Sequence, residues 1–193
     1  MRINEIFYSL QGEGYFTGTP AVFVRFAGCN LRCPFCDTDH EPFTEMTPEE
    51  VVEEVGRYPA RHVVITGGEP SLQLTGTLVE ALHAAGKFVA VETNGTHPLP
   101  PEVDWVTLSP KDAFVGGKAA RPVLARCDEL KVVYTGDTLP DYGHIAATHR
   151  FLQPCDTGDA ARNREIMKGA VQYCLEHPAW RLSLQTHKVL DIR

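Results

Sequence analysis

The chain has 193 residues, of which 43% are hydrophobic, and its 18 Lys and Arg against 25 Asp and Glu give a net charge of -7. This length suits one domain with its own core. The acidic balance argues against nucleic acid as the main partner, because that binding depends on basic phosphate contacts. Residues 1–5 lack a signal-peptide start, and no apolar run approaches the ~20 residues of a membrane span. We therefore expect a single cytoplasmic domain over residues 1–193, without membrane or nucleic-acid partners.

Apolar, β-branched runs alternate with helix-like stretches along the chain. The predicted strands cover residues 21–27, 62–66, 88–92, 105–109, 129–134, 149–153 and 181–185, and several are apolar on both faces, as in a covered parallel sheet. The predicted helices cover residues 48–57, 72–85 and 160–176. Thr47 is the expected N-cap of the first helix, with Pro48 at its first position, and Gly86 ends the second helix.

This alternation of strands and helices predicts an α/β fold with right-handed crossovers. Residues 109–123 and 135–144 are too short, or too rich in Gly and Pro, for regular crossover helices. A full eightfold barrel also needs ~250 residues. We therefore predict an incomplete (β/α) barrel that is reduced in helices.

Ligands of parallel α/β folds bind at the carboxyl ends of the strands. Five of the predicted strands are followed there by chemically distinctive loops. These loops contain Cys29, Gly67, Thr93, Pro110 and Pro154. We expect all five to converge on one mouth of the barrel.

The first of these loops carries three of the six cysteines, Cys29, Cys33 and Cys36, in the spacing C-x3-C-x2-C. In a reducing compartment such thiols are better explained as metal ligands or catalytic groups than as disulfides. A purely electron-transferring four-iron cluster normally takes four cysteines, so three close ligands leave one iron open to another molecule. The alternatives are a structural zinc site with His40 as fourth ligand, or chance clustering of structural cysteines. Zinc does not explain the glycine-rich and polar loops predicted at the same mouth, which favours the open cluster.

The cysteine motif, with aromatic Phe35 before its last member, resembles that of the radical S-adenosylmethionine (SAM) superfamily. The resemblance implies that the three cysteines hold a 4Fe-4S cluster and that the methionine group of SAM chelates its open iron. The reduced cluster would cleave SAM to a deoxyadenosyl radical that abstracts hydrogen, in a site that excludes oxygen and water. The implied fold is the incomplete barrel of radical SAM type.

The loop Thr66-Gly67-Gly68-Glu69-Pro70 follows an apolar strand. Paired glycines let a backbone approach a ligand closely, and a carboxylate suits a cationic amino group. By resemblance, this GGEP motif binds the methionine end of SAM, and later loops line the adenosine side. Residues 92–95 are weaker candidates, and each outer loop has the alternative interpretation of a capped strand end. The cofactor-binding residues implied are Phe35, Asp37, Gly67, Gly68, Glu69, Ser109, Pro110, Lys111, Gln153, Pro154, Cys155 and Asp156.

Arg25 shares one face of its predicted strand with Phe23 and Ala27. If the opposite face packs against helices, Arg25 points inward near the cysteine loop. A buried arginine there would clamp an anion, and a carboxylate fits its planar fork. The alternative is an arginine that faces solvent from an edge strand.

Pieces spread over nearly the whole chain resemble one family within that superfamily, the 7-carboxy-7-deazaguanine synthases. Beside the motifs above, they include Leu10-Gln11-Gly12-Glu13-Gly14, Cys36-Asp37-Thr38 and Gln185-Thr186-His187-Lys188. The resemblance implies ring contraction of 6-carboxy-5,6,7,8-tetrahydropterin with loss of ammonia, and with SAM regenerated. The pathway implied is queuosine and deazapurine biosynthesis, which serves tRNA modification. The substrate contacts implied are Leu10, Gln11, Gly12, Arg25 and Thr66.

The same resemblance implies magnesium, with the Thr38 hydroxyl as a ligand. Mg²⁺ prefers hard oxygen ligands, so one threonine should bind it only together with substrate. The alternative is Thr38 as a helix cap between Asp37 and Asp39. Family analogy also implies a flavodoxin or ferredoxin as electron donor, and a homodimer. His187 and Lys188 receive no catalytic step.

Two competing functions share part of this pattern. A glycyl-radical activating enzyme, or another radical SAM enzyme, would have the cysteine and glycine motifs. It would give no reason for Gln11-Gly12-Glu13 together with Arg25, or for magnesium. A zinc-binding or electron-carrier module should not cleave SAM. The sequence therefore predicts a radical SAM lyase that acts on a pterin.

Overall fold

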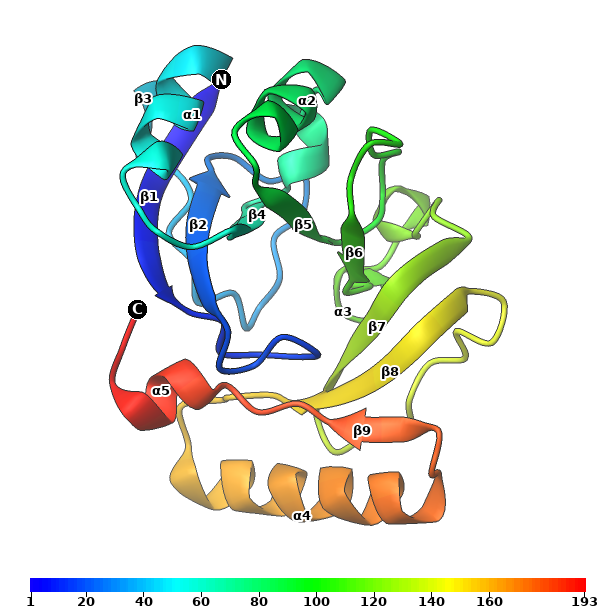
Figure 1. Ribbon diagram of the computed structural model, residues 1–193. Coiled ribbons are helices and arrows are strands. Elements are labelled where there is room, and N and C mark those ends of the chain that lie inside the picture. Colours follow the sequence, from blue (N-terminus) through cyan, green and yellow to red (C-terminus); the bar gives the residue numbers. More distant parts are fainter.

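The strands of the computed structural model, which describes all 193 residues, form one nine-stranded sheet in the order β3-β1-β2-β4-β5-β6-β7-β8-β9. Strand β2 and strands β4 to β9 pair in parallel, whereas β1 is antiparallel to β2 and β3 is antiparallel to β1. The edge strands β3 and β9 do not pair, so the curved sheet in Figure 1 is an incomplete barrel, as predicted. The strands are β1 (Arg2–Leu10), β2 (Pro20–Phe26), β3 (Thr44–Glu45), β4 (His62–Gly67), β5 (Phe88–Thr93), β6 (Trp105–Leu108), β7 (Arg126–Tyr134), β8 (Ala146–Pro154) and β9 (Trp180–Leu182).

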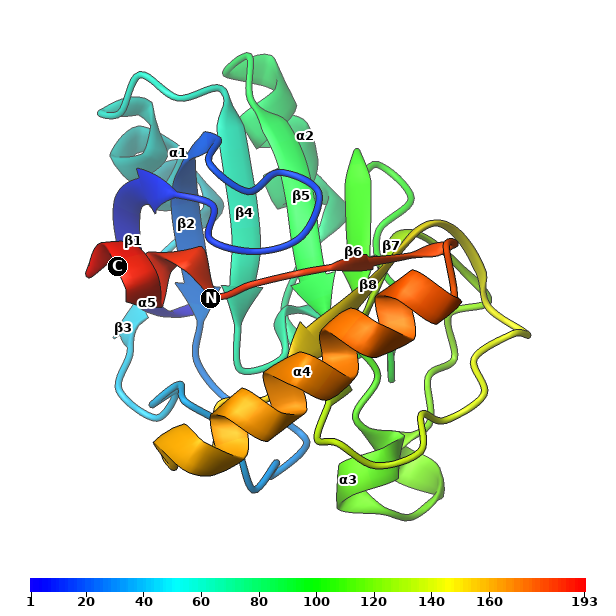
Figure 2. The ribbon, with the colours of Figure 1, turned by 90° about the horizontal axis from the view of Figure 1, so that it is seen from below.

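The structure has five helices, α1 (Pro48–Gly56), α2 (Gly76–Ala84), α3 (Asp112–Val115), α4 (Ala160–Glu176) and α5 (Thr186–Leu190). Of these, α1, α2 and α4 cover parts of the outer face of the sheet (Figure 1). Helices α1 and α2 lie together on one side, and α4 crosses the other side against β8 and β9 (Figures 1 and 2). The β6–β7 connection holds only the four-residue α3 and a short 3₁₀ turn, and the β7–β8 connection holds no helix. The prediction of two crossovers without regular helices is confirmed. No helix combines the length and the apolar character that crossing a membrane requires.

The two faces of β2 have different surroundings, as its sequence predicts. Val22, Val24 and Phe26 are completely buried in the core cluster that includes the inner faces of α1 and α2. Phe23 and Arg25 point the other way and line the cavity inside the barrel. Burial of the apolar face against the helices therefore fixes the direction in which Arg25 points.

The β1–β2 loop closes the amino-terminal end of the barrel. The ring of Phe16 lies 4.5, 5.8 and 4.8 Å, centroid to centroid, from those of His62, Phe88 and Trp105, the first residues of three adjacent parallel strands. Figure 2 shows this loop crossing β4 and β5. The ligand-binding chemistry is thus left to the opposite end, at the carboxyl ends of the strands.

Several boundaries differ from the predicted ones. Helix α2 begins at Gly76 rather than residue 72, because Pro70–Leu72 forms a separate 3₁₀ turn and Thr75 caps the helix. Strand β1 escaped prediction because a register shift between Ile3 and Glu5 interrupts its alternation of buried and exposed residues. The short elements β3, α3 and α5 were also not predicted. The predicted N-cap of α1, Thr47, is confirmed, and it forms a capping box with hydrogen bonds in both directions between Thr47 and Glu50.

Candidate active site

A cavity of about 1050 Å³ opens at the carboxyl ends of the parallel strands. The structure brings nearly all the sequence-predicted site residues to its wall, from loops far apart in the chain. Glu69 and Pro110 are the exceptions, since both are buried behind the wall. The predicted residues that line the cavity are Leu10, Gln11, Gly12, Arg25, Cys29, Cys33, Phe35, Cys36, Asp37, Thr38, Thr66, Gly67, Gly68, Ser109, Lys111, Gln153, Pro154, Cys155 and Asp156.

The three motif cysteines lie on an irregular loop that leads away from β2. All three line the cavity, and the Cys29 thiol accepts a hydrogen bond from the Leu31 amide at 3.4 Å. Burial raises the pKa of the Cys29 and Cys33 thiols, so their thiolates need a stabilising cation such as iron. No three His, Cys, Asp or Glu side chains converge as ligands of one metal ion. All three thiols are free, so each is available as a ligand.

The loop after β6 places Lys111 in the same cavity as the motif cysteines. Lys111 donates hydrogen bonds to the Ser109 carbonyl at 2.7 Å and to its hydroxyl at 2.6 Å. Burial lowers the pKa of Lys111 to about 8, against the opposing influence of Cys33. Cys155 lines the same cavity, whereas Cys127 and Cys174 pack in or against the hydrophobic core below α4, as expected of structural cysteines.

The paired glycines let two strand ends touch backbone to backbone. A Cβ on Gly67 would collide with Phe26, and a Cβ on Gly68 would collide with the Gly28 carbonyl. The Gly68 amide donates to the Phe26 carbonyl at 3.0 Å, and the Glu69 amide donates to the Gly28 carbonyl at 2.9 Å. Because Gly28 directly precedes Cys29, this contact fixes the GGEP loop beside the cysteine loop.

The Glu69 carboxylate does not face the cavity, where the sequence analysis expected it to meet a cationic amino group. It is completely buried, and it accepts hydrogen bonds from the Ser71 amide at 3.0 Å, the Thr93 hydroxyl at 2.6 Å and the Asn94 amide at 2.7 Å. With three donors, the charge is satisfied within the protein. Glu69 therefore positions the loops after β4 and β5 and leaves the approach to a ligand to the glycine backbone.

A buried group of charges forms the floor of the cavity, and sequence reasoning missed its centre, Lys131. The Lys131 ammonium lies 2.5 Å from a Glu13 oxygen and 3.5 Å from a Glu92 oxygen. Burial opposes ionisation of Glu13, but the charge of Lys131 prevails and lowers the pKa of Glu13 to about 2. Burial also opposes the charge on Lys131, but Glu13, Glu92 and Glu129 prevail and raise its pKa. The available signal was the pattern Asp128-Glu129-Leu130-Lys131 in an otherwise apolar strand.

Arg25 lines the same cavity, in the orientation predicted for it. Its Nε is 2.9 Å from a Glu5 carboxylate oxygen, and its Nη1 donates to the Thr38 hydroxyl at 3.4 Å. Glu5 was missed because β1 was not predicted. Thr38 caps no helix, since α1 begins only at Pro48, and its hydroxyl borders the cavity.

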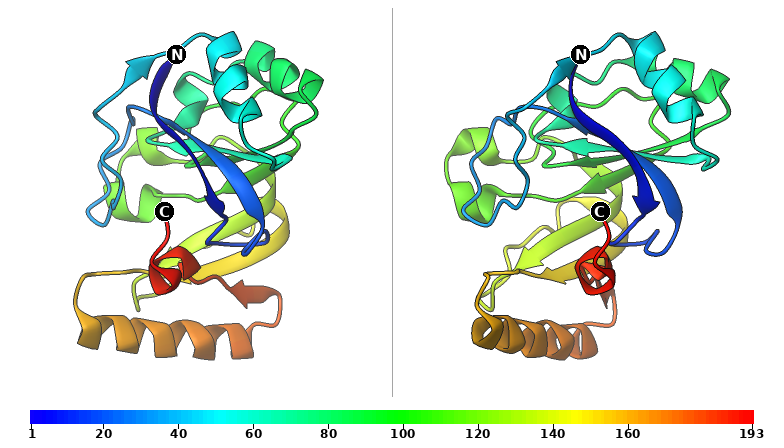
Figure 3. Two further views of the ribbon diagram at one scale, coloured as in Figure 1. Left: turned by 60° about the vertical axis from the view of Figure 1, so that its left-hand side comes forward. Right: turned by 90° about the vertical axis from the view of Figure 1, so that its left-hand side faces the viewer.

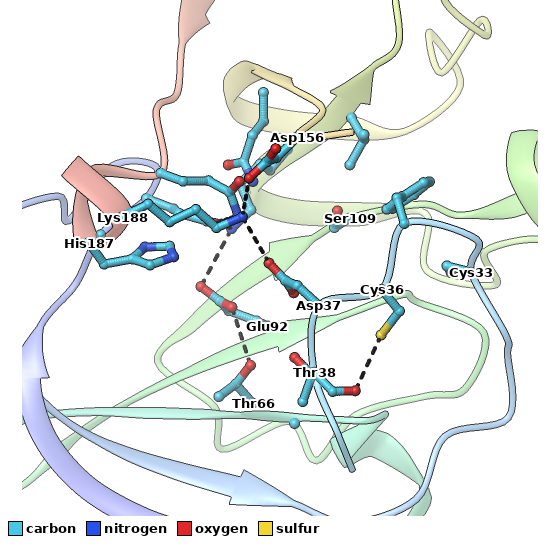
Figure 4. A pocket seen from close by; sticks show the side chains of 18 of the residues that line it. Cys33, Cys36, Asp37, Thr38, Thr66, Glu92, Ser109, Asp156, His187 and Lys188 are labelled. Atoms are coloured by element: carbon cyan, nitrogen blue, oxygen red, sulfur yellow. Dashed lines mark hydrogen bonds and ion pairs between the residues drawn. The ribbon is translucent and has the colours of Figure 1, made fainter. Parts of the chain in front are cut away.

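The carboxyl-terminal segment lies at the mouth of the cavity. The Lys188 ammonium is 3.3 Å from Asp37 on the cysteine loop and 2.9 Å from Asp156 after β8 (Figure 4). Both the amide and the hydroxyl of Thr186 donate to the Gly12 carbonyl, at 2.9 and 2.8 Å. Helix α5 thereby joins three loops of the site, and the chain end lies beside β1 (Figure 3).

Comparison with known proteins agrees with this geometry. Residues 23–109 match the model of the Radical SAM superfamily. The chain is 55% identical over 192 residues to 7-carboxy-7-deazaguanine synthase of Bacteroides thetaiotaomicron, with 100% of this chain and 98% of the relative covered. It is 45% identical to the enzyme of that name from Bordetella pertussis, with 98% of each chain covered.

Solved structures give the same result. The crystal structure of QueE from Escherichia coli superposes with a TM-score of 0.74 at 31% identity, over 95% of this chain and 92% of that one. Streptococcus suis SuiB, at 15% identity and a TM-score of 0.52, shares the fold alone.

The incomplete barrel and its three-cysteine loop are thus those of a radical SAM enzyme, a class that uses a 4Fe-4S cluster and SAM. Within that class, the chain belongs to the 7-carboxy-7-deazaguanine synthase family.

Substitution of Gly68 by Ala tests the contact between the two strand ends. We expect Gly68→Ala to push the GGEP loop away from Gly28 and to weaken SAM binding by about tenfold or more, because small displacements of binding loops are costly. The measurement is equilibrium binding of SAM to the anaerobically reconstituted protein, with iron content as a second readout. Gly56→Ala is the matched control, since a Cβ there meets open space. Equal SAM affinity in both variants would contradict the assigned contact.

Proposed function

We propose that this chain converts 6-carboxy-5,6,7,8-tetrahydropterin into 7-carboxy-7-deazaguanine, with loss of ammonia, in queuosine and deazapurine biosynthesis. The observation that carries the proposal is one cavity whose wall holds the cysteine loop, an inward-facing arginine and an acidic floor. Family membership at 55% identity over the whole chain supports the same reaction. The alternative of a glycyl-radical activating enzyme gives no reason for this arrangement.

In this proposal, the cysteine loop binds the cluster, and the GGEP loop and the later loops bind SAM. When bound, the cluster and SAM supply one-electron hydrogen abstraction from C6 of the pterin, and SAM is regenerated. Cys29, Cys33 and Cys36 would hold the cluster, and the Gly67-Gly68 backbone would hold the methionine end of SAM. The adenosine side is lined by the remaining predicted residues: Phe35, Asp37, Ser109, Lys111, Gln153, Pro154, Cys155 and Asp156.

The substrate occupies the space between the cysteine loop and the acidic floor. Arg25 binds its carboxylate, because a guanidinium has five N–H donors and its recorded contacts here use only Nε and Nη1. Gln11 and Thr66 bind the pterin ring, with Leu10 and Gly12 as further contacts. Gln11 and Thr66 both donate to Glu92, at 3.1 and 3.3 Å, which leaves the Thr66 hydroxyl oxygen to accept a hydrogen bond from the ring. The Gln11 amide oxygen already accepts one from the Glu13 amide at 3.1 Å and has one lone pair left for the ring.

Several properties rest on family analogy. The cluster receives its electron from a flavodoxin or ferredoxin, and two copies of the chain form a homodimer in the cytoplasm. The chain acts as a single radical SAM domain over residues 1–193, since one sheet runs through it from β1 to β9.

Magnesium is the third cofactor, and Thr38 supplies its protein ligand. The Thr38 hydroxyl borders the cavity and lies 3.4 Å from Arg25, the proposed carboxylate clamp. A substrate carboxylate on Arg25 would therefore lie within reach of an ion on Thr38. One neutral hydroxyl is a weak site by itself, so ion and substrate bind together.

Replacing Thr38 by Val removes the hydroxyl and keeps the shape. We expect Thr38→Val to raise the magnesium concentration that gives half-maximal turnover by about tenfold. Thr38→Ser, which keeps the hydroxyl, should remain within about threefold of the unaltered protein. The measurement is turnover against Mg²⁺ concentration at saturating substrate. A Thr38→Val curve that coincides with that of Thr38→Ser would rule out the hydroxyl as a ligand.

The reaction itself is tested with the reconstituted chain. Under anaerobic conditions, with reductant, SAM, Mg²⁺ and the carboxytetrahydropterin, we expect carboxydeazaguanine to appear in the mass spectrum while most of the SAM stays intact. Product formed with one SAM consumed per turnover would contradict catalytic use of SAM. Cleavage of SAM without conversion of the pterin would leave the superfamily in place and remove the substrate assignment.

A further inference from the structure

Lys131 is the most deeply buried charge that faces the cavity and has no place in the proposed chemistry. It lies on β7 with only 6% of its side chain exposed, and it contacts carboxylates from two other segments. An unpaired lysine could not remain charged in such a place. The three partners are Glu13 in the β1–β2 loop, Glu92 on β5 and Glu129 on β7 itself.

The first two carboxylates are not equivalent. Glu13 has two short contacts, with Lys131 at 2.5 Å and with the Gln185 amide at 3.0 Å, and only 15% of its side chain is exposed. Glu92 has longer contacts, with the Gln11 amide at 3.1 Å, the Thr66 hydroxyl at 3.3 Å and Lys131 at 3.5 Å, and 26% is exposed. Glu92 is therefore the more exposed and the more loosely held of the two carboxylates, and the one better placed to contact a ligand in the cavity.

We propose that Lys131 is a positioning residue that neutralises Glu13 and so leaves Glu92 open toward the substrate ring. This inference rests on the proposed function, which places a ring with amino and amide N–H donors in the cavity. Lys131 touches no substrate in this account and acts through the two carboxylates. The positive charge of Lys131 is required because two carboxylates in one buried site cannot both stay ionised without a cation between them.

Other charged groups face the same floor. Burial raises the pKa of Glu129, which accepts a hydrogen bond from the Tyr15 amide at 3.0 Å. Lys111 approaches from the loop after β6, His187 from α5, and the Arg25 and Glu5 pair from β2 and β1. Lys131 also opposes the rise in the pKa of Glu129, so a new pH dependence is assigned to Glu13 only if it disappears in a variant that also lacks the Glu13 carboxylate.

A purely structural role would give a different result. A buried ion pair often adds little to stability, and its loss then lowers the melting temperature without changing ligand recognition. The positioning role instead predicts a change in KM for the pterin that depends on pH and on Glu13. These two outcomes can be separated in the intact holoenzyme.

The test compares Lys131→Met, Lys131→Met/Glu13→Gln and the control Lys168→Met, an exposed lysine of α4. We expect Lys131→Met to raise KM for the carboxytetrahydropterin by about tenfold or more, with a smaller change in kcat. KM should fall again as pH rises, because the proton that Glu13 takes up in the absence of Lys131, and with which it would occupy Glu92, is then lost. SAM affinity, measured separately, should stay within about threefold.

The double variant Lys131→Met/Glu13→Gln should have a KM close to that of the unaltered protein and should lose the pH dependence. The control Lys168→Met should match the unaltered protein.

Two results would overturn the inference while the proposed function stands. One is a Lys131→Met enzyme whose KM is unchanged or independent of pH, and the other is a double variant no better than the single one. If Lys131→Met fails to take up iron, the single variant Glu13→Gln provides the test. The Glu13→Gln substitution frees Lys131 to pair with Glu92, so KM for the carboxytetrahydropterin should rise. An unchanged KM would overturn the inference. An unaltered protein that binds SAM but never converts the pterin would instead remove the proposed function.

Discussion

The direct backbone contact between the ends of β2 and β4 holds the site together. Gly68 lies so close to Gly28 that neither strand end can move without separating the cysteine loop from the GGEP loop. The buried Glu69 carboxylate then joins this pair to the loop after β5 through Thr93 and Asn94. Parallel pairing continues the same edge through β9, so each later loop arrives beside the previous one. A cluster, a cofactor and a substrate can therefore share one cavity although their ligands are far apart in the sequence.

Charge inside the cavity is arranged by pairs that span distant segments. Arg25 pairs with Glu5, Lys131 with Glu13, and Lys188 joins Asp37 to Asp156. The Lys131–Glu13 pair is buried, and a buried pair contributes more to where a charged group points than to overall stability. In the proposed function, Arg25 binds the carboxylate of the substrate and Glu92 its ring N–H groups. These two contacts together would orient an asymmetric substrate relative to the cysteine loop.

Local signals in the sequence predicted the barrel, the convergence of the strand-end loops, the cysteine ligands and the direction of Arg25. The other residues of the cavity wall were implied by the resemblance to a known family. The sequence could not reveal Glu5, Lys131 or the placement of α5. Each depends on a contact between segments more than a hundred residues apart or on an irregular strand. Glu69 shows the converse limit, because a motif identifies a carboxylate but not the neighbours that consume its hydrogen-bonding capacity.

The central claim is that three cysteines hold a cluster whose open iron faces the same cavity as the acidic floor. The electron paramagnetic resonance spectrum of the reduced, reconstituted chain tests it most directly, recorded alone, with SAM, and with SAM and the carboxytetrahydropterin. SAM should shift the g values by binding the open iron, and the pterin should shift them further because it lies against SAM. A cluster spectrum that SAM leaves unchanged would contradict the account.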